Sequence, residues 1–445
     1  MATDPVRSIR ATEQESPVVP DLKAALGRLA ALPPSPSGHV LTVSFDWSID
    51  GSEPGRLPAP APKRSQERAM RGETGAPRRP GWQQMQRELH ALVESHGPRG
   101  ETYDALAADL ARITAFVDND LDLSVNGVFI VADGQQGVFE AIPLDVAPTP
   151  SLILESVPAL RPLVHASEDY PTFAVVNANQ QEANVWVIER LGWSENIRVA
   201  SDGYPRHQAT GGLNAQRYQN RANERVEAFA RVVAEQVNRL FLESSTPPDY
   251  LILSDDEPMS TAIAQHLHKD VTPKVLGRIE LGKDPLPTEI AATVAPMIEA
   301  AERQEETDAV QKVSDNVGAQ TLGIAGAVDT LRALANGQVQ MLVMNDDFTA
   351  TGWADYTLPL FGLGDIPAEH PAGGDVANLR VTKLEDEAVR LALPNGGTVE
   401  LIQTTEPLHA DTETPRAGGE APRAAAATTL DGLGGIGAVL RYDIA

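Results

Sequence analysis

A diglycine at Gly211-Gly212 leads directly into a segment with the periodicity of one long helix, from about residue 214 to 242. Adjacent glycines allow positive φ angles, and Asn214 is a favourable N-cap, so Ala215 is predicted to open the helix. Apolar residues recur at helical spacing and predict one buried face: Val226, Phe229, Val233, Val237 and Leu240. Arginines recur every four residues and predict a separate basic stripe: Arg217, Arg221 and Arg225.

Short apolar strands and amphipathic helices alternate on both sides of this segment, which predicts an α/β fold. A length of 445 residues exceeds what one core supports, so we expect three α/β domains. The stretch 352–374 contains several Gly and Pro residues and is expected to be rich in loops. The predicted organisation is a disordered or loosely attached arm at 1–37, an N-terminal domain at 38–158 with a basic Pro-rich loop at 56–82, a middle domain at 159–312 that carries the diglycine loop, and a C-terminal domain at 313–445 with a mobile insertion at 409–429.

The net charge of −26 argues against general affinity for nucleic acid, because phosphate binding needs local positive charge. Two basic clusters stand out against this background, and any RNA contact is expected there. The first lies in the Pro-rich loop: Arg56, Lys63, Arg64, Arg68, Arg71, Arg78 and Arg79. The second surrounds the diglycine: Arg206, His207, Arg217, Arg221 and Arg225. Solvated surface charge is the alternative interpretation of both clusters.

Motifs for several common chemistries are absent or incomplete. The chain has no cysteine, which excludes disulfides and thiolate sites. The segment 277–283 has the glycine and lysine spacing of a phosphate-binding P-loop, but Asp284 stands where a magnesium-binding hydroxyl is needed. The acidic residues at 118–122 and 255–257 are interpreted as a helix-terminating turn and a helix cap. We therefore expect no metal and no cofactor, and the lack of apolar spans or a secretory signal predicts a cytoplasmic protein.

The diglycine loop and its helix are compatible with a device that probes RNA or with an ordinary turn and capped helix. The sequence around them resembles the eukaryotic and archaeal class-I release factor and Pelota family over roughly residues 160–445. The resemblance in the loop rests on Gly211, Gly212, Asn214, Ala215, Arg217 and Tyr218. Two C-terminal segments, 396–401 and 434–442, resemble the final strands of that family's third domain, and 327–344 resembles its helix and strand. The first 150 residues are more similar to the distinct first domain of bacterial relatives.

This resemblance implies an RNase-H-like middle domain and a C-terminal α/β domain like the kink-turn-binding ribosomal protein fold. It also implies that the loop Gly211, Gly212, Leu213 and Asn214 enters the ribosomal A site near the peptidyl-transferase centre. In release factors a glutamine at the position of Leu213 helps to place the attacking water. Leucine keeps a backbone N–H but does not orient water, so we expect no catalytic residue here.

The implied role is ribosome hibernation, as for the bacterial family member Balon, or ribosome rescue without hydrolysis. The expected partners are the ribosome, through rRNA and P-site tRNA, and a translational GTPase such as elongation factor Tu, with no membrane and no DNA. One alternative is an active peptidyl-tRNA hydrolase or release factor in ribosome quality control. A second is an RNase-H-like nuclease, which requires clustered carboxylates around two metal ions.

Overall fold

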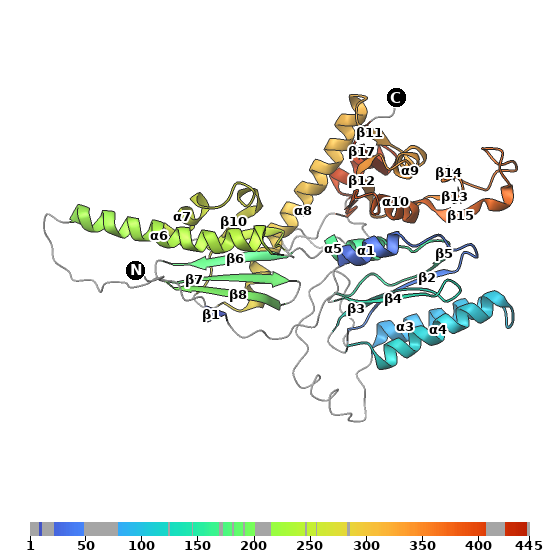
Figure 1. The fold of residues 1–445 in the computed structure, drawn as a ribbon, viewed down its shortest axis with the longest axis horizontal. Helices are drawn as coiled ribbons and strands as arrows, with labels where there is room; N and C mark the ends of the chain where they lie inside the picture. The colour runs from blue at the N-terminus through green and yellow to red at the C-terminus, as the bar shows by residue number, and fades with distance from the viewer. Residues whose placement is uncertain are drawn as a thin grey trace, which may run out of the picture. The chain divides into compact units, whose positions relative to one another are not determined.

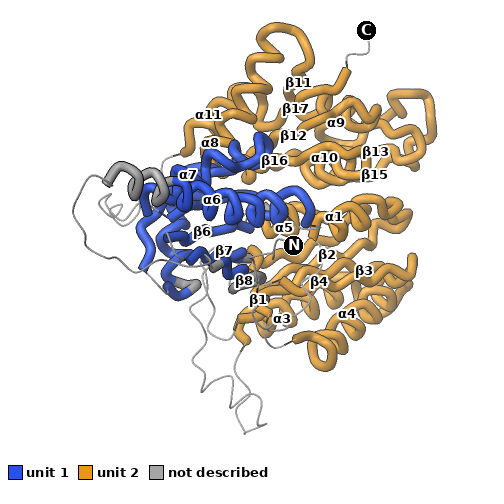
Figure 2. The backbone as a smooth tube through the Cα atoms, turned by 60° about the vertical axis from the view of Figure 1, so that its left-hand side comes forward, with its two compact units in different colours: residues 1–18, 170–302 blue, residues 19–169, 303–445 orange. Residues whose placement is uncertain are grey.

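The computed structural model describes residues 9–10, 22–48, 79–122, 125–144, 146–168, 172–179, 182–189, 192–200, 215–244, 247–254, 256–282, 285–405 and 423–442. The chain forms two compact units, each assembled from two separate stretches (Figure 2). Unit 1 comprises residues 1–18 and 170–302, and unit 2 comprises residues 19–169 and 303–445. Both units mix helices with sheets, so the predicted α/β class is confirmed.

Unit 1 is built on a six-stranded sheet in the order β1-β8-β7-β6-β9-β10 (Figure 1). The strands from β1 to β6 pair antiparallel, whereas β6, β9 and β10 run parallel to one another. The strands are β1 (Ile9–Arg10), β6 (Phe173–Ala178), β7 (Glu182–Glu189), β8 (Gly192–Ala200), β9 (Tyr250–Ser254) and β10 (Val275–Ile279).

Helices cover both faces of this sheet because its central strands are apolar on both sides. In β6, Ala174 and Val176 pack in a cluster with one set of helices, while Phe173 and Val175 belong to a second cluster. The first cluster contains α6 (Ala215–Leu242) and α7 (Met259–Gln265), and the second contains the start of α8 (Pro287–Gly318). Unit 1 is therefore a three-layered α/β/α arrangement.

The N-terminal part of unit 2 has a four-stranded antiparallel sheet in the order β4-β3-β2-β5. One face is apolar and packs against two helices, with Phe45 and Trp82 rings 5.0 Å apart. Figure 1 shows α3 and α4 on this side and α1 and α5 on the other. The elements are α1 (Leu22–Ala30), β2 (Val40–Asp46), α3 (Pro80–Ser95), α4 (Glu101–Asn119), β3 (Gly127–Asp133), β4 (Val138–Leu144), β5 (Ser151–Glu155) and α5 (Arg161–Glu168).

Two features of this part differ from the sequence expectation. Residues 22–30 lie within the expected loose arm at 1–37, yet they form α1, in which Leu22, Leu26 and Leu29 are buried. This apolar face packs in unit 2, since α1 contacts α5 and α10. The stretch 147–158 contains β5, a strand that the sequence did not predict, which pairs with β2 and completes the sheet.

The C-terminal part of unit 2 has a four-stranded sheet in the order β11-β17-β12-β16. The end of α8 packs with α11 in one apolar cluster on this sheet, while α9 and α10 contact its strands separately. A second sheet, β14-β13-β15, lies between β12 and α10 along the chain. The elements are β11 (Gly323–Ala325), α9 (Ala327–Ala335), β12 (Val339–Asn345), β13 (Thr351–Asp355), β14 (Leu360–Leu363), β15 (Arg380–Lys383), α10 (Leu384–Ala392), β16 (Thr398–Ile402), α11 (Ala425–Asp431) and β17 (Ile436–Leu440).

Two further segments of this part contain elements that the sequence did not predict. The loop-rich stretch 352–374 contains β14 and most of β13, and the ring of Trp353 packs on Gly362 where these strands pair antiparallel. The predicted mobile insertion at 409–429 ends in α11, where Ala427 and Leu430 are buried against the sheet. The rest of that insertion, 409–422, lies outside the described residues.

Candidate functional site

Helix α6 is fixed to unit 1 along its second half. The predicted apolar face is confirmed, since Phe229, Val233 and Val237 are buried against the sheet and Val226 packs beside them. At about 1.5 Å per residue the 28 residues of α6 span about 42 Å, and Figure 1 shows the helix extending past the strands at one end. The sheet therefore positions a helix longer than itself.

Polar contacts with α7 add to this attachment. The Nε2 atom of His266 lies 2.9 Å from a carboxylate oxygen of Glu227. The side chain of Asn238 donates to the carbonyl oxygen of His266 at 3.3 Å and accepts from the backbone N–H of His268 at 2.8 Å. These contacts hold α6 against rotation about its axis, which fixes the direction of every other face.

The arginines at four-residue spacing precede the residues of α6 that contact the sheet and α7. Arg225 is exposed, and Arg217 and Arg221 belong to the first turns of α6, where only the backbone is described. Arg217 and Arg221 precede Arg225 at four-residue spacing in the sequence. Farther along, the outer surface has mixed charge, with Arg239 donating to Glu235 at 2.6 Å.

The diglycine loop itself lies outside the described residues. This applies to Gly211, Gly212, Leu213, Asn214, Arg206 and His207. The structure does show that α6 begins at Ala215, as the glycines and Asn214 predict. The first helical residue of the basic stripe is therefore close in sequence to Leu213.

The first basic cluster needs one correction. Arg79 is predicted from the sequence to be available for RNA, but it is buried, with its guanidinium 3.9 Å from the centre of the Trp47 ring. It also donates to the carbonyl oxygen of Trp47. Burial lowers the pKa of Arg79 to about 10, and nearby Asp46 opposes that shift. This arginine holds α3 to the end of β2, while the other basic residues of the cluster lie outside the described part.

Where the structure describes the residues of the incomplete motifs, they form secondary structure or hydrogen bonds within the fold. Residues 277–279 lie in β10, as expected for a strand instead of a phosphate-binding loop. Glu257 accepts from Thr261 at 2.7 Å and from Arg278, although no side chain caps α7 at Pro258. Among the described residues, no group of three or more His, Asp or Glu could hold a metal ion. No helix in that part of the chain has the length and apolar character needed to span a membrane.

The closing glycine motif of the C-terminal part has a packing role. Gly435 has a φ of +76°, and an added Cβ would lie 2.9 Å from the Phe348 ring. Its carbonyl oxygen accepts from the backbone N–H of Asn345 at 3.0 Å. The motif therefore locks the turn before β17 against the end of β12.

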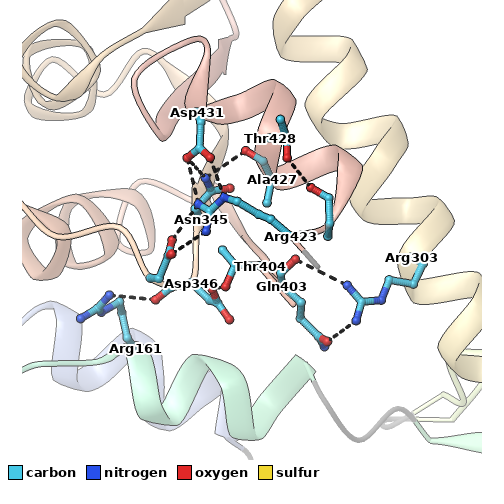
Figure 3. A network of polar contacts seen from close by, with 12 residues as sticks. Arg161, Arg303, Asn345, Asp346, Gln403, Thr404, Arg423, Ala427, Thr428 and Asp431 are labelled. Carbon is cyan, nitrogen blue, oxygen red and sulfur yellow. Dashed lines mark hydrogen bonds and ion pairs between the residues drawn. The ribbon is translucent and has the colours of Figure 1, made fainter. Parts of the chain in front are cut away.

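A polar network surrounds this end of β12 (Figure 3). Arg423 donates to Asp347 at 2.7 Å and to Asp431 at 2.6 Å, while Asn345 also donates to Asp431 at 2.7 Å. Hydrogen bonding to Arg423 lowers the pKa of Asp347. No local sequence pattern indicates this role for Arg423, because it lies in the low-complexity segment.

Residues 158–306 match the family model for bacterial archaeo-eukaryotic release factor family 10. The matched segment includes the diglycine loop, α6 and all of unit 1 from residue 170 onward. Over this segment the chain is similar to bacterial release factors of the archaeo-eukaryotic type. The resemblance drawn from the loop residues is therefore confirmed for residues 158–306.

Several solved structures of release factors and Pelota proteins are similar to this chain at low identity. The archaeal translation termination factor aRF1 is 13% identical, with 94% of this chain and 98% of that chain covered and a TM-score of 0.23. Dom34 of S. cerevisiae, described as a translation termination-like factor interacting with Hbs1, is 12% identical over 73% and 83% of the two chains, with a TM-score of 0.38. Ribosome-bound archaeal Pelota, from a structure that also contains ABCE1, is 11% identical over 99% and 97%, with a TM-score of 0.35. At these values the similarity to release factors rests on the matched segment, residues 158–306.

Proposed function

We propose that this release-factor-like protein binds the ribosomal A site and places residues 211–214 near the peptidyl-transferase centre. It would act in ribosome hibernation or rescue without hydrolysing peptidyl-tRNA. The observation that carries this proposal is the family match over residues 158–306, which includes the diglycine loop and α6. Support comes from Arg225, which is exposed on a helix whose apolar residues pack against the sheet of unit 1.

Electrostatics support contact with RNA through the start of α6. Three arginines at four-residue spacing form a basic stripe on a chain whose net charge is −26. Phosphates attract that stripe and repel most of the remaining surface, so the protein would approach RNA in one orientation. Arg206 and His207 extend the positive charge along the loop in sequence.

The residue at the tip of the loop favours binding without catalysis. Leu213 stands where the family resemblance places a water-positioning glutamine, and an aliphatic side chain makes no hydrogen bond to water. Removing a positioning or transition-state donor typically lowers a rate by about 10²–10³. We therefore propose a factor that occupies the centre and leaves the ester intact.

The remaining finer assignments are part of the same proposal. The strand order and two helical layers of unit 1 support an RNase-H-like middle domain at 159–312. The sheet β11-β17-β12-β16, with helices packed on it, supports a C-terminal domain at 313–445 like the kink-turn-binding ribosomal protein fold. That domain would contact a translational GTPase such as elongation factor Tu, while the loop would approach rRNA and P-site tRNA. Such a factor would work in the cytoplasm.

Co-sedimentation with 70S ribosomes over a range of salt concentrations tests the binding step. We expect salt-sensitive binding that is weakened in Arg217→Ala/Arg221→Ala, with the slope of log K against log salt reduced by roughly 1.5–2. The matched control is Arg231→Ala/Arg239→Ala, which removes the same charge from exposed positions of the same helix. Absence of binding to every ribosomal state, or equal losses in both variants, would overturn the proposal.

A peptidyl-tRNA hydrolysis assay on the same ribosomes tests the second step. We expect no release by the natural chain above the rate without protein, and detectable release by Leu213→Gln. Release by the natural chain that is lost when Gly212 is made bulky would instead establish the hydrolase alternative. RNA cleavage that requires added magnesium would favour the nuclease alternative.

A further inference from the structure

Unit 1 has a polar cavity that the proposed function does not use. It has a volume of about 430 Å³, within the range of small-molecule sites, which is roughly 300–1,000 Å³. The residues that line it come from the ends of β6, β9 and β10 and from the start of β7: Asn177, Asn179, Glu182, Asn184, Ser254, Asp256, Glu280, Leu281 and Gly282. All of them belong to unit 1.

The cavity lies at a position where the topology of α/β sheets favours a ligand. After β6 the chain adds β7 and β8 on one side of the sheet and then adds β9 and β10 on the other. Because β6 and β9 are parallel neighbours, their carboxyl ends meet at one edge, where the direction of strand addition changes. Open α/β sheets bind ligands at the carboxyl ends of strands beside such a switch point.

Internal hydrogen bonds orient two of the lining side chains. The amide nitrogen of Asn177 donates to the carbonyl oxygen of Gly282 at 3.0 Å, which leaves the amide oxygen of Asn177 to accept. The hydroxyl oxygen of Ser254 accepts from the backbone N–H of Ala178 at 3.1 Å. Fixed polar atoms at the floor of a cavity reduce the entropy lost when a ligand binds.

The charged residues that line the cavity indicate the class of ligand it would bind. Glu182 is compensated by Arg198, whose guanidinium lies 2.6 Å from its carboxylate. Asp256 and Glu280 are exposed, and neither forms an ion pair with another described residue. The described lining residues offer carboxylate and amide oxygens as acceptors for N–H donors on a cation.

We propose that this cavity binds a small organic cation with several amine groups, of the polyamine class. Its ammonium groups would donate to Asp256 and Glu280, with Asn177 and Asn184 accepting between them. A cavity of this size holds a linear polyamine, whereas a bare metal ion would fill only a small part of it. The site is independent of ribosome binding through α6.

Isothermal titration calorimetry of spermidine into the full chain tests the assignment. We expect saturable binding of one equivalent, weakened about tenfold or more in Asp256→Asn/Glu280→Gln, because hydrogen bonds to charged groups are lost while side-chain shape is kept. The matched control is Glu243→Gln/Glu299→Gln, which removes the same charge elsewhere in unit 1 and should leave the affinity unchanged.

Two results would overturn the proposal. One is the absence of saturable binding at millimolar spermidine. The other is an equal loss of affinity in both double variants, which would indicate only general attraction to an acidic protein. Thermal unfolding of each variant separates lost binding from lost folding, and titrations with adenosine and inorganic phosphate should give no heat beyond dilution. Asp256→Asn/Glu280→Gln should co-sediment with ribosomes as the natural chain does. A failure of the cavity proposal can therefore be told apart from a failure of the proposed function.

Discussion

Asp386 is a buried carboxyl group whose ionisation should oppose folding at neutral pH. It lies in α10 with a side chain 2% exposed, and neither carboxylate oxygen has a hydrogen-bond partner. The nearest cation is Arg161, with its Nε atom 3.8 Å from Oδ1 of Asp386. Burial raises the pKa of Asp386 from 3.8 to about 7; Arg161 and Lys383 oppose the shift, while Glu385 and Glu155 add to it.

The sign of the effect follows from proton binding in the two states. Between pH 3.8 and about 7 the folded chain holds a proton on Asp386 that the unfolded chain has released, so stability falls as pH rises through this window. A shift of about three pKa units at roughly 1.4 kcal/mol each corresponds to about 4 kcal/mol above pH 7. Roughly 3 kcal/mol of this develops between pH 5 and pH 8.

The test is Asp386→Asn, which keeps the shape and removes the ionisation. Its free energy of unfolding should exceed that of the natural chain by about 3 kcal/mol more at pH 8 than at pH 5. Urea titrations at pH 5 and pH 8 measure this difference in the free energy of unfolding. Hydrogen-exchange mass spectrometry on peptides of α10 follows the same change in the helix. The control Asp365→Asn changes an exposed carboxylate in the same unit and should have little effect at either pH. An equal gain at both pH values, or a loss at pH 8, would refute the reasoning.

Three other substitutions test contacts within unit 2. Arg161→Ala removes donors to the carbonyl oxygens of Asp346 and Phe348, at 3.2 and 3.0 Å, and leaves Asp386 without its cation. The free energy of unfolding from urea titration should fall by about 2–4 kcal/mol. The control Arg28→Ala, at an exposed position, should lower it by less than about 1 kcal/mol. Gly435→Ala should cost about 1–3 kcal/mol in the same assay, from its φ of +76° and the Phe348 ring, whereas Gly318→Ala, with no atom near the added Cβ, should be neutral. Buried His370 forms a hydrogen bond with Asp355 at 2.9 Å and accepts hydrogen bonds from two backbone N–H groups. His370→Ala should therefore lower the free energy of unfolding by about 2–4 kcal/mol and speed amide exchange over residues 371–379. Unchanged exchange would contradict this.

Sequence periodicity identifies elements wherever one face is buried along a continuous segment. Helix α6 begins at the predicted residue and buries the predicted face, because Val226 to Leu240 repeat every three or four residues over many turns. The diglycine and its flanking residues lie in the segment that matches the release-factor family model. What periodicity does not reveal is a partner distant in the chain, and the pairing of Arg161 with Asp386 has no local sequence pattern.

The missed strands have a common cause. Strands β13, β14 and β15 have four or five residues each, and two of them contain glycines that sequence patterns assign to loops. Their stability comes from cross-strand contacts, such as the Trp353 ring on Gly362, and from packing of Leu384 against Gly352. Short strands of this kind are defined by the surfaces they meet, so only the folded chain shows them.

The arrangement of α6 explains how one helix serves both folding and recognition. Its apolar face from Val226 onward is fully used by the sheet, and Glu227 and Asn238 fix its rotation. Three basic residues precede that point in the sequence at four-residue spacing, and Arg225, the last of them, is exposed. Under the proposed function, Arg217→Ala and Arg221→Ala should therefore weaken ribosome binding while the unfolding midpoint stays within about 0.5 kcal/mol of the natural chain. A large loss of stability in the same variant would show that these arginines support the fold and would remove the main support for α6 as the RNA-contacting element.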